Sequence, residues 1–171
     1  MKSLKYVLVC VSLLLSFSGF AQIEGPKTEN GLTWYSDMTK ASEVSMATHK
    51  PIFAFFTGSD WCGWCRKLQN DVFSKPEFLA WAKNNVVLVE LDFPRSKKLS
   101  PELTNQNASL QQTFQVQGYP TIWMFYLKKA ADKFEIDALG SVGYPQGAVQ
   151  GKEQVKFLAD ANALLAKKKK A

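Results

Sequence analysis

The sequence predicts an α/β domain in which buried β-strands alternate with helices. Residues 51–56 and 86–92 are almost wholly apolar, which is typical of strands buried on both faces of a sheet. Segments with a helical spacing of apolar residues lie between and after these strands. The chain has 171 residues and is 46% hydrophobic, which suits one globular domain with a core of its own.

The first 21 residues have the pattern of an export signal. Two lysines precede an apolar segment over residues 6–15, and the small residues up to Ala21 match the positions that signal peptidase recognises. The apolar segment is too short to span a bilayer comfortably, so we expect cleavage after Ala21. The mature protein would then be periplasmic or secreted, with Cys62 and Cys65 as its only cysteines.

The charge of the chain favours no particular partner. The formal net charge is +6, and removal of the two lysines in the signal segment lowers it to +4. Much of the remainder lies in a lysine-rich tail, residues 167–171, which we interpret as the solvated end of the last helix. An anionic partner is weakly supported, and no segment resembles a nucleic-acid-binding module.

A single domain is predicted over residues 36–166. Residues 22–35 are expected to form a flexible N-terminal lead-in because of their glycine-containing turns, with a short strand or edge contact at residues 34–35. A helix over residues 37–48 follows, capped by the Ser-Asp pair at its start. The only histidine, His49, is expected in solvent at the end of this helix, where nothing places it beside the cysteines.

The remaining elements are predicted from capping residues and apolar spacing. Ser74, Pro76 and Glu77 have the pattern of a capping box, and Ser100 precedes Pro101 at another helix start. Helices are expected over residues 66–73, 76–83 and 101–114, and a strand over 86–92. Strands over 122–127 and 134–139 are expected to pair as a hairpin around a polar turn at 128–133. A last helix is expected over 152–166.

Cys62 and Cys65 lie where a buried strand turns into a helix. A thiolate attacks a disulfide, and the unpaired N–H groups and dipole of a helix N-terminus stabilise a thiolate. Cys65, three residues on, lies on the same helical face and within reach of the first sulfur. Gly63 removes side-chain bulk between the cysteines, and Trp64 is expected to shield Cys65 from water. The pattern therefore predicts a dithiol redox site.

Other interpretations of the cysteine pair stay open. The pair could form a structural disulfide in a binding module whose exposed Trp61, Trp64 and Tyr119 bind a peptide. A zinc site would need four ligands, and besides the two cysteines the mature chain has only His49. Binding of soft copper(I) by the two sulfurs is the weakest alternative.

Pro120 directly precedes a predicted central strand, where a residue that cannot donate to the ladder is disfavoured. A cis bond between Tyr119 and Pro120 would resolve this conflict.

The order of elements, with Trp-Cys-Gly-Trp-Cys at 61–65 and Gly-Tyr-Pro-Thr at 118–121, resembles the thioredoxin superfamily. The Thr-Gly-Ser-Asp-Trp-Cys segment at 57–62 is most similar to its exported bacterial branch. The resemblance covers about residues 36–166. It implies a thioredoxin-like fold: a central mixed β-sheet of parallel strands plus a C-terminal hairpin, flanked by helices.

The resemblance also implies a role for each matching residue. Cys62 would be the nucleophile and Cys65 the resolving thiol. Pro120 would be the cis-proline, whose loop faces the cysteines and lets an extended substrate pair with its backbone. The implied substrate-binding residues are Trp61, Trp64, Tyr119, Pro120 and Thr121.

One departure from thioredoxin concerns proton transfer. The buried aspartate beneath the cysteines of thioredoxin is replaced here by Phe55 or Phe56, which cannot exchange protons. Glu90 or Asp92 on the neighbouring strand could substitute for it, or could be solvated or capping groups at a strand end. Asp60 is expected to be a surface loop residue.

The sequence thus predicts an exported thiol-disulfide oxidoreductase that exchanges disulfides with protein thiols and disulfides, most simply as a reductase or isomerase. It would need no metal and no organic cofactor, only the redox-active disulfide Cys62–Cys65. In an oxidising compartment a reductase needs a donor, and a membrane electron-transfer protein is the natural candidate. Gly63-Trp64 replaces the Gly-Pro of thioredoxin, so the direction of electron flow stays open, as do the substrates and the oligomeric state.

Overall fold

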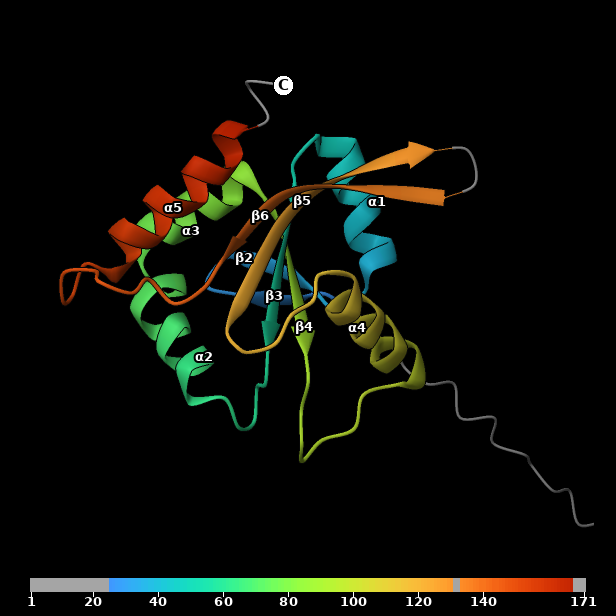
Figure 1. The fold of residues 1–171 in the computed structure, drawn as a ribbon, viewed down its shortest axis with the longest axis horizontal. Helices are drawn as coiled ribbons and strands as arrows, with labels where there is room; N and C mark the ends of the chain where they lie inside the picture. Colours follow the sequence, from blue (N-terminus) through green and yellow to red (C-terminus); the bar gives the residue numbers. More distant parts are fainter. Residues whose placement is uncertain (1–24, 131–132, 168–171) are drawn as a thin grey trace, which may run out of the picture.

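A six-stranded β-sheet forms the centre of the computed structural model, which describes residues 25–130 and 133–167 (Figure 1). The expected signal segment, residues 1–21, and the end of the lysine-rich tail lie outside these residues. In chain order the elements are β1 (Lys27–Glu29), β2 (Leu32–Tyr35), α1 (Met38–Thr48), β3 (Ile52–Thr57), α2 (Gly63–Leu68), the π-helical turn η1 (Gln69–Phe73), α3 (Pro76–Asn85), β4 (Val87–Asp92), α4 (Pro101–Thr113), β5 (Thr121–Ala130), β6 (Lys133–Val142) and α5 (Glu153–Lys167).

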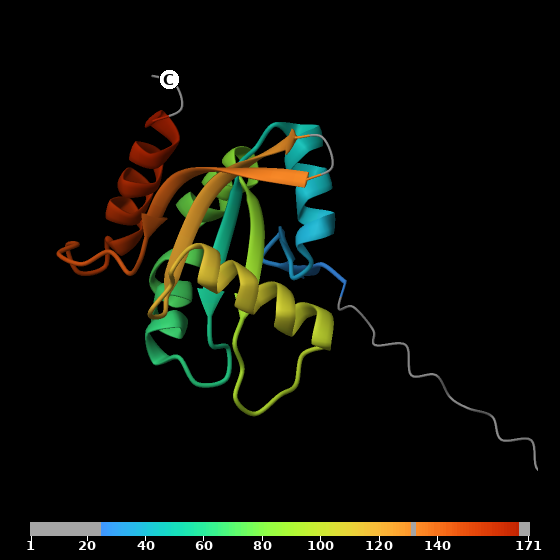
Figure 2. The same cartoon turned by 45° about the vertical axis from the view of Figure 1, so that its right-hand side comes forward.

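The strand order is β1-β2-β4-β3-β5-β6. Strands β2, β4 and β3 are parallel, whereas the pairs β1–β2, β3–β5 and β5–β6 are antiparallel. Helices α2, α3 and α5 cover one face of the sheet, and α1 and α4 cover the other (Figures 1 and 2). The mixed sheet with a C-terminal hairpin and flanking helices confirms the predicted fold class.

The two helical layers explain the apolar character of the central strands. Every residue of β3 is buried, and its side chains alternate between two apolar clusters. Phe53 and Phe55 enter the cluster beneath α2, α3 and α5, whereas Ile52 and Phe56 enter the one beneath α1 and α4. A strand covered on both faces has no solvent-facing positions, so its sequence is continuously apolar.

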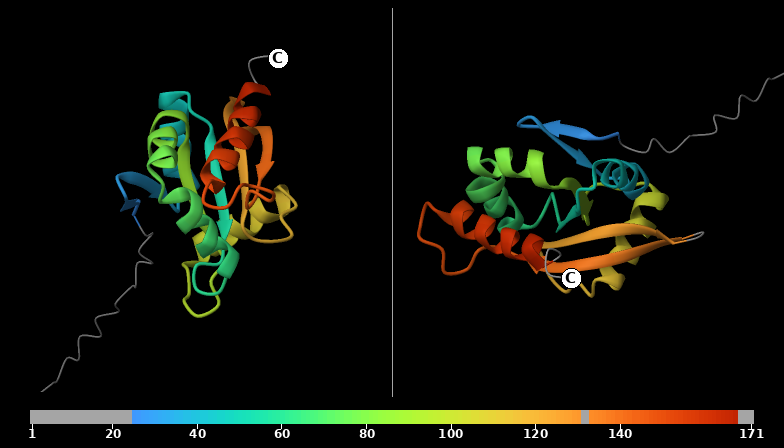
Figure 3. Two further views of the ribbon diagram at one scale, coloured as in Figure 1. Left: turned by 90° about the vertical axis from the view of Figure 1, so that its left-hand side faces the viewer. Right: turned by 90° about the horizontal axis from the view of Figure 1, so that it is seen from above.

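The short strand expected at residues 34–35 lies within β2, whereas residues 25–33 differ from the flexible lead-in that was expected. The N-terminal segment contains a hairpin, β1–β2, which turns at Asn30 and Gly31, both with positive φ. Strand β2 then pairs in parallel with β4, so the segment adds two strands to the sheet (Figure 3). The signal for β2 is weak because only Leu32 and Trp34 of its four residues are buried.

The helix starts confirm two of the three predicted caps. The side-chain oxygens of Asp37 and Ser100 cap α1 and α4. The capping box expected at Ser74 does not form, since α3 has no side-chain cap. The Ser74 hydroxyl donates instead to the carbonyl of Asn70, because the preceding helix continues through η1 up to this residue. His49 is exposed at the end of α1, as predicted.

The C-terminal hairpin is longer than predicted. Its pairing extends to Ala130 opposite Lys133, so residues expected in the polar turn belong to the strands. An ion pair between Lys128 and Asp137, 2.9 Å apart, links the two strands in this region. The connecting residues 131–132 lie outside the described residues.

Several chain segments meet at one edge of the sheet. Strands β2, β3, β4 and β6 run in the same direction and end at this edge, whereas β5 runs the opposite way and starts there. The loops that follow β3, β4 and β6 therefore converge with the loop that precedes β5 (Figure 2). This edge carries the cysteines.

Trp34 anchors the β1–β2 hairpin to the core. Its ring centroid lies 6.3, 6.2 and 5.7 Å from those of Phe53, Phe55 and Phe73. We predict that Trp34→Ala lowers the free energy of unfolding by about 3 kcal/mol, because loss of a large buried ring leaves a cavity. Urea denaturation followed by circular dichroism measures this change.

Thr33→Ala is the matched control, since Thr33 is the exposed neighbour of Trp34 on the same strand. This control should change the unfolding free energy little. Equally small effects of both substitutions would show that the hairpin contributes nothing to the fold.

Candidate active site

Cys62 and Cys65 form a disulfide at the start of α2, with an S–S distance of 2.08 Å and a Cα–Cα distance of 5.3 Å. Cys62 is the N-cap residue, and the backbone N–H of Cys65 donates to its sulfur at 3.1 Å. Cys62 is 5% exposed and Cys65 only 1%. Both cysteines are thus nearly covered, Cys65 slightly more than Cys62.

Backbone hydrogen bonds fix the turn before Cys62. The N–H groups of Trp61 and Cys62 both donate to the carbonyl of Gly58, at 3.2 and 2.8 Å. A Cβ at Gly58 would clash with the indole ring of Trp61. The turn therefore requires glycine, which lets the indole ring fold back over the loop.

The end of β4 holds the same loop in place. Strands β3 and β4 end in register, with Thr57 opposite Asp92. The Asp92 carboxylate accepts hydrogen bonds from the backbone N–H and the hydroxyl of Ser59, at 2.8 and 2.7 Å, and lies 3.0 Å from the ammonium of Lys97. Asp92 is thus a capping group at a strand end, which is one of the two interpretations that its sequence position allowed.

A second set of contacts joins the loop after β4 to the cysteine loop. The Asp60 carboxylate accepts from the backbone N–H groups of Ser96 and Arg95, at 2.6 and 3.0 Å, and these bonds lower its pKa. The indole N–H of Trp61 donates to the carbonyl of Phe93 at 2.8 Å. Asp60 is exposed, as predicted, and it also clamps the two loops together.

The predicted residues around the proline loop lie together. The rings of Trp61 and Tyr119 pack edge to face with centroids 5.7 Å apart, and the guanidinium of Arg95 lies 4.0 Å from the Trp61 ring centroid. The Tyr119–Pro120 bond is cis, as predicted. The Thr121 hydroxyl donates to a carbonyl of the same turn at 2.7 Å.

Trp64 contacts a different loop. It is 55% exposed, and its ring centroid lies 5.2 Å from that of Tyr144, between β6 and α5. The Trp64 ring is thus largely in solvent, whereas Cys65 belongs to the buried core cluster. The expected shielding of Cys65 is therefore provided mainly by the core. Nothing in the sequence singles out Tyr144, because it lies in a glycine-rich loop without apolar periodicity.

Phe55, and not Phe56, lies on the face of the sheet that the cysteines cover. It belongs to the same core cluster as the two sulfurs, whereas Phe56 faces α1 and α4. Glu90 lies opposite Phe55 in the β3–β4 ladder, so both side chains point to the same face of the sheet. Because Asp92 is engaged by the cysteine loop, Glu90 is the remaining candidate for the missing proton-transfer group.

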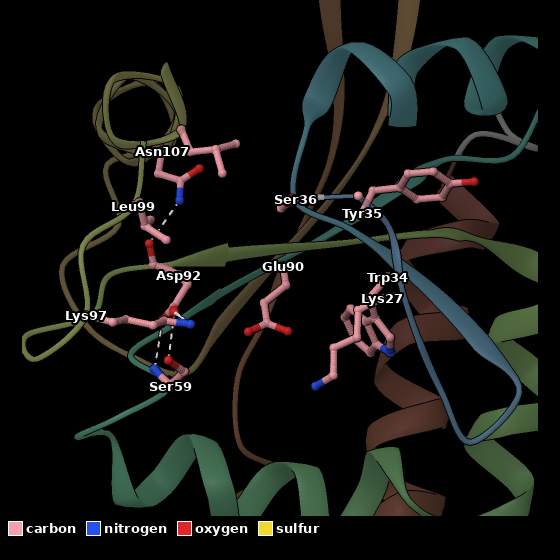
Figure 4. A pocket seen from close by; sticks show the side chains of 12 residues that line it. Lys27, Trp34, Tyr35, Ser36, Ser59, Glu90, Asp92, Lys97, Leu99 and Asn107 are labelled. Carbon is pink, nitrogen blue, oxygen red and sulfur yellow. Dashed lines mark hydrogen bonds and ion pairs between the residues drawn. The ribbon is translucent and has the colours of Figure 1, made fainter. Parts of the chain in front are cut away.

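The Glu90 carboxylate points into a pocket between β2, β4 and the cysteine loop (Figure 4). Burial raises the pKa of Glu90, and the neighbouring Asp92 carboxylate raises it further, whereas Lys27 and Lys97 partly oppose this shift. None of the side chains drawn in Figure 4 forms a hydrogen bond with Glu90. The group therefore favours its neutral, protonated form more than an exposed glutamate does.

Metal ligands do not cluster in residues 25–130 and 133–167, where no three histidine, cysteine or acidic side chains could hold one ion. In these same residues no helix has both the length and the apolar character needed to cross a bilayer.

Residues 38–131 match the thioredoxin-like domain family. The chain belongs to this family. The matched segment begins at the start of α1 and ends just beyond β5, so it contains both the disulfide and the cis-proline loop. This result confirms the superfamily that the sequence resembles.

Two proteins of Chlamydia pneumoniae are similar in sequence. "Disulfide bond reductase DsbH" is 38% identical over 97 residues, which cover 57% of this chain and 58% of the relative. "Thioredoxin-related protein DsbJ" is 27% identical over 165 residues, which cover 95% of this chain and 46% of the relative. The chain spans about half the length of these curated relatives.

Two solved structures are similar in fold. One described as a DsbH oxidoreductase superposes with a TM-score of 0.66 at 28% identity, covering 82% of this chain and 91% of that one. A thioredoxin from Thermus thermophilus superposes with a TM-score of 0.54 at 18% identity, covering 80% and 88%. The second similarity shows the fold alone.

Glu90 makes the stability depend on pH. Its pKa in the folded protein lies above the ordinary value of 4.5, so ionisation of this carboxyl destabilises the fold increasingly as the pH rises above that value. We predict that Glu90→Gln is more stable than the wild type at about pH 7, and that the difference shrinks towards about pH 4, where the carboxyl is largely protonated in both states.

Thermal unfolding across this pH range measures the difference. Glu135→Gln, which replaces a glutamate at an exposed position of β6, is the control. A stability difference for Glu90→Gln that stays constant with pH would contradict the prediction.

Proposed function

We propose that the protein is an exported thiol-disulfide oxidoreductase that acts on the disulfides of other proteins. The observation that carries the proposal is the position of the Cys62–Cys65 disulfide at a helix N-terminus, where the backbone N–H of Cys65 donates to the Cys62 sulfur. Membership of the thioredoxin-like family supports it. The names of the two relatives, a disulfide bond reductase and a thioredoxin-related protein, support it as well.

In the reduced protein, Cys62 acts as the attacking thiolate. Its sulfur stands where the backbone N–H of Cys65 already donates a hydrogen bond, and the start of the helix favours negative charge. The thiolate attacks one sulfur of the substrate disulfide. A bond forms between Cys62 and that sulfur, the substrate S–S bond breaks, and the second substrate sulfur leaves as a thiolate.

Cys65 completes the exchange. After losing its proton, it attacks the sulfur of Cys62, forms the intramolecular disulfide and releases the first substrate sulfur. Two electrons pass from the enzyme dithiol to the substrate disulfide, and the two protons end on the substrate thiols. The scheme uses no metal and no organic cofactor.

The neighbouring loops form the docking surface. We assign the backbone around Pro120 and Thr121 to pairing with an extended substrate segment, flanked by Trp61 and Tyr119. Packing of Trp61 between Tyr119 and Arg95 holds these rings in place before the substrate arrives. A surface fixed in advance loses less conformational freedom on binding.

The central test uses single cysteine variants of the reduced protein. We predict that Cys62→Ser reduces insulin disulfides no faster than the buffer thiol does, because the attacking sulfur is gone. Cys65→Ser should still attack but fail to release its substrate, so a mixed disulfide accumulates, which mass spectrometry detects.

Val155→Ala, at an exposed position of α5, is the control and should retain full activity. Unchanged activity in Cys62→Ser would contradict the proposed function. It would favour the alternative, a thioredoxin-like binding module with a structural disulfide.

Reduction is the direction that we propose, on the strength of the relative named as a disulfide bond reductase. We predict that the potential of the Cys62–Cys65 pair lies closer to about −270 mV, as in thioredoxin, than to about −120 mV, as in the oxidant DsbA. Equilibration in thiol buffers of known potential measures it. A value at the upper end would make the protein an oxidant of its substrates.

Export is proposed from the signal pattern of residues 1–21. An oxidising compartment would keep the pair oxidised, so the reductase needs electrons from a donor, for which we propose a membrane electron-transfer protein. We predict a mature chain that begins at Gln22, to be read by N-terminal sequencing of the protein recovered outside the cytoplasm. An uncleaved chain found only with cytoplasmic proteins would contradict this.

A further inference from the structure

The loop between β6 and α5 places an aromatic ring beside the cysteine pair. The ring of Tyr144 in this loop packs against Trp64 with an interplanar angle of 65° and a centroid distance of 5.2 Å. Trp64 nevertheless remains 55% exposed, although large aromatic side chains are usually well buried. The pair therefore leaves ring surface uncovered within two residues of Cys62.

Tyr144 is held firmly on its other sides. Its hydroxyl donates to the carboxylate of Asp71 at 2.6 Å, across 73 residues of sequence. Lys67 pairs with the same carboxylate at 2.6 Å, and its ammonium lies 5.3 Å from the centroid of the Tyr144 ring. The preceding residue, Gly143, lies beside the cis-proline loop, since an added Cβ would be 3.4 Å from the carbonyl oxygen of Pro120. The ring is thus held against α2 and η1, in a loop that also borders the cis-proline loop.

The charges beside this surface are paired with each other. Lys67 and Asp71 neutralise each other, and the Tyr144 hydroxyl already donates its hydrogen bond. Trp64 and Tyr144 therefore present mainly ring surface. Such a surface fits an aromatic or long aliphatic side chain, which gains ring contacts and leaves water at the same time.

The pair lies on the opposite side of the cysteines from Trp61. Trp61 contacts the loop that follows β4, whereas Trp64 contacts the loop that follows β6. Strands β4 and β6 lie on either side of the central β3–β5 pair, so their loops flank α2 from two sides (Figure 1). A substrate segment that crosses Cys62 therefore meets one aromatic surface on each side.

We propose that Trp64 and Tyr144 form an aromatic platform that selects protein substrates with an aromatic or long aliphatic side chain next to the cysteine that Cys62 attacks. Its occupant is an extended segment of the substrate polypeptide. The role rests on the proposed oxidoreductase function and deepens it, because it makes Tyr144 a specificity residue.

Two disulfide peptides test the platform. They differ only in the residue next to the cysteine, which is phenylalanine in one and serine in the other, and both are reduced by the full chain in its dithiol form. We expect kcat/KM to be about tenfold higher for the phenylalanine peptide, which is the effect of one well-packed aromatic contact.

Three variants assign the preference to the ring. Tyr144→Ala should remove it, whereas Tyr144→Phe keeps the ring, loses the bond to Asp71 and should keep most of the preference. Tyr126→Ala, in the half of β5 remote from Pro120, is the matched control and should keep it in full.

Glutathione disulfide, which has no large apolar side chain, separates failure of the platform from failure of the proposed function. If the wild type reduces all three disulfides without preferring the phenylalanine peptide, or if Tyr144→Ala keeps the preference, the platform is overturned and the oxidoreductase function stands. An equal loss of all three reactions in Tyr144→Ala would mean that the ring only supports α2, which also overturns the platform. If the wild type reduces none of them, the proposed function itself fails.

Discussion

The register between β3 and β4 is the constraint on which the site depends. Because Thr57 ends opposite Asp92, the Asp92 carboxylate reaches both donors of Ser59 and fixes the loop that leads to Cys62. A slip of one residue would turn every side chain of a strand to the opposite face. It would withdraw Asp92 from the loop and turn Phe55 away from the face that the cysteines cover, so the same pairing that builds the core also positions the chemistry.

Features that depend on short stretches of chain could be predicted from the sequence. The two apolar runs located β3 and β4, because a strand covered by helices on both faces keeps few polar positions. Ser100 located the start of α4, because its cap is a bond to a backbone N–H only three residues away. The cysteine pair and Pro120 were recognisable because their chemistry fixes both residue type and spacing.

Features that depend on distant contacts could not be predicted in this way. A short strand was expected at residues 34–35, but its pairing with β4, more than 50 residues further on, follows from no local pattern. Tyr144 gains its place from a bond to Asp71 that no local pattern encodes. At Ser74 a local capping pattern is present in the sequence, but the cap does not form because the preceding helix continues up to this residue.

Both outer strands of the sheet are poor templates for another strand. At one edge, β1 has three exposed residues, and its Lys27 and Glu29 pair with each other at 2.7 Å. At the other edge, β6 exposes Glu135, and α5 reaches its later half, where Lys167 donates to the carbonyl of Leu139. Short, charged or covered edges resist strand addition. If the protein acts on other polypeptide chains, as we propose, it can meet their unpaired strands without adding them to its own sheet.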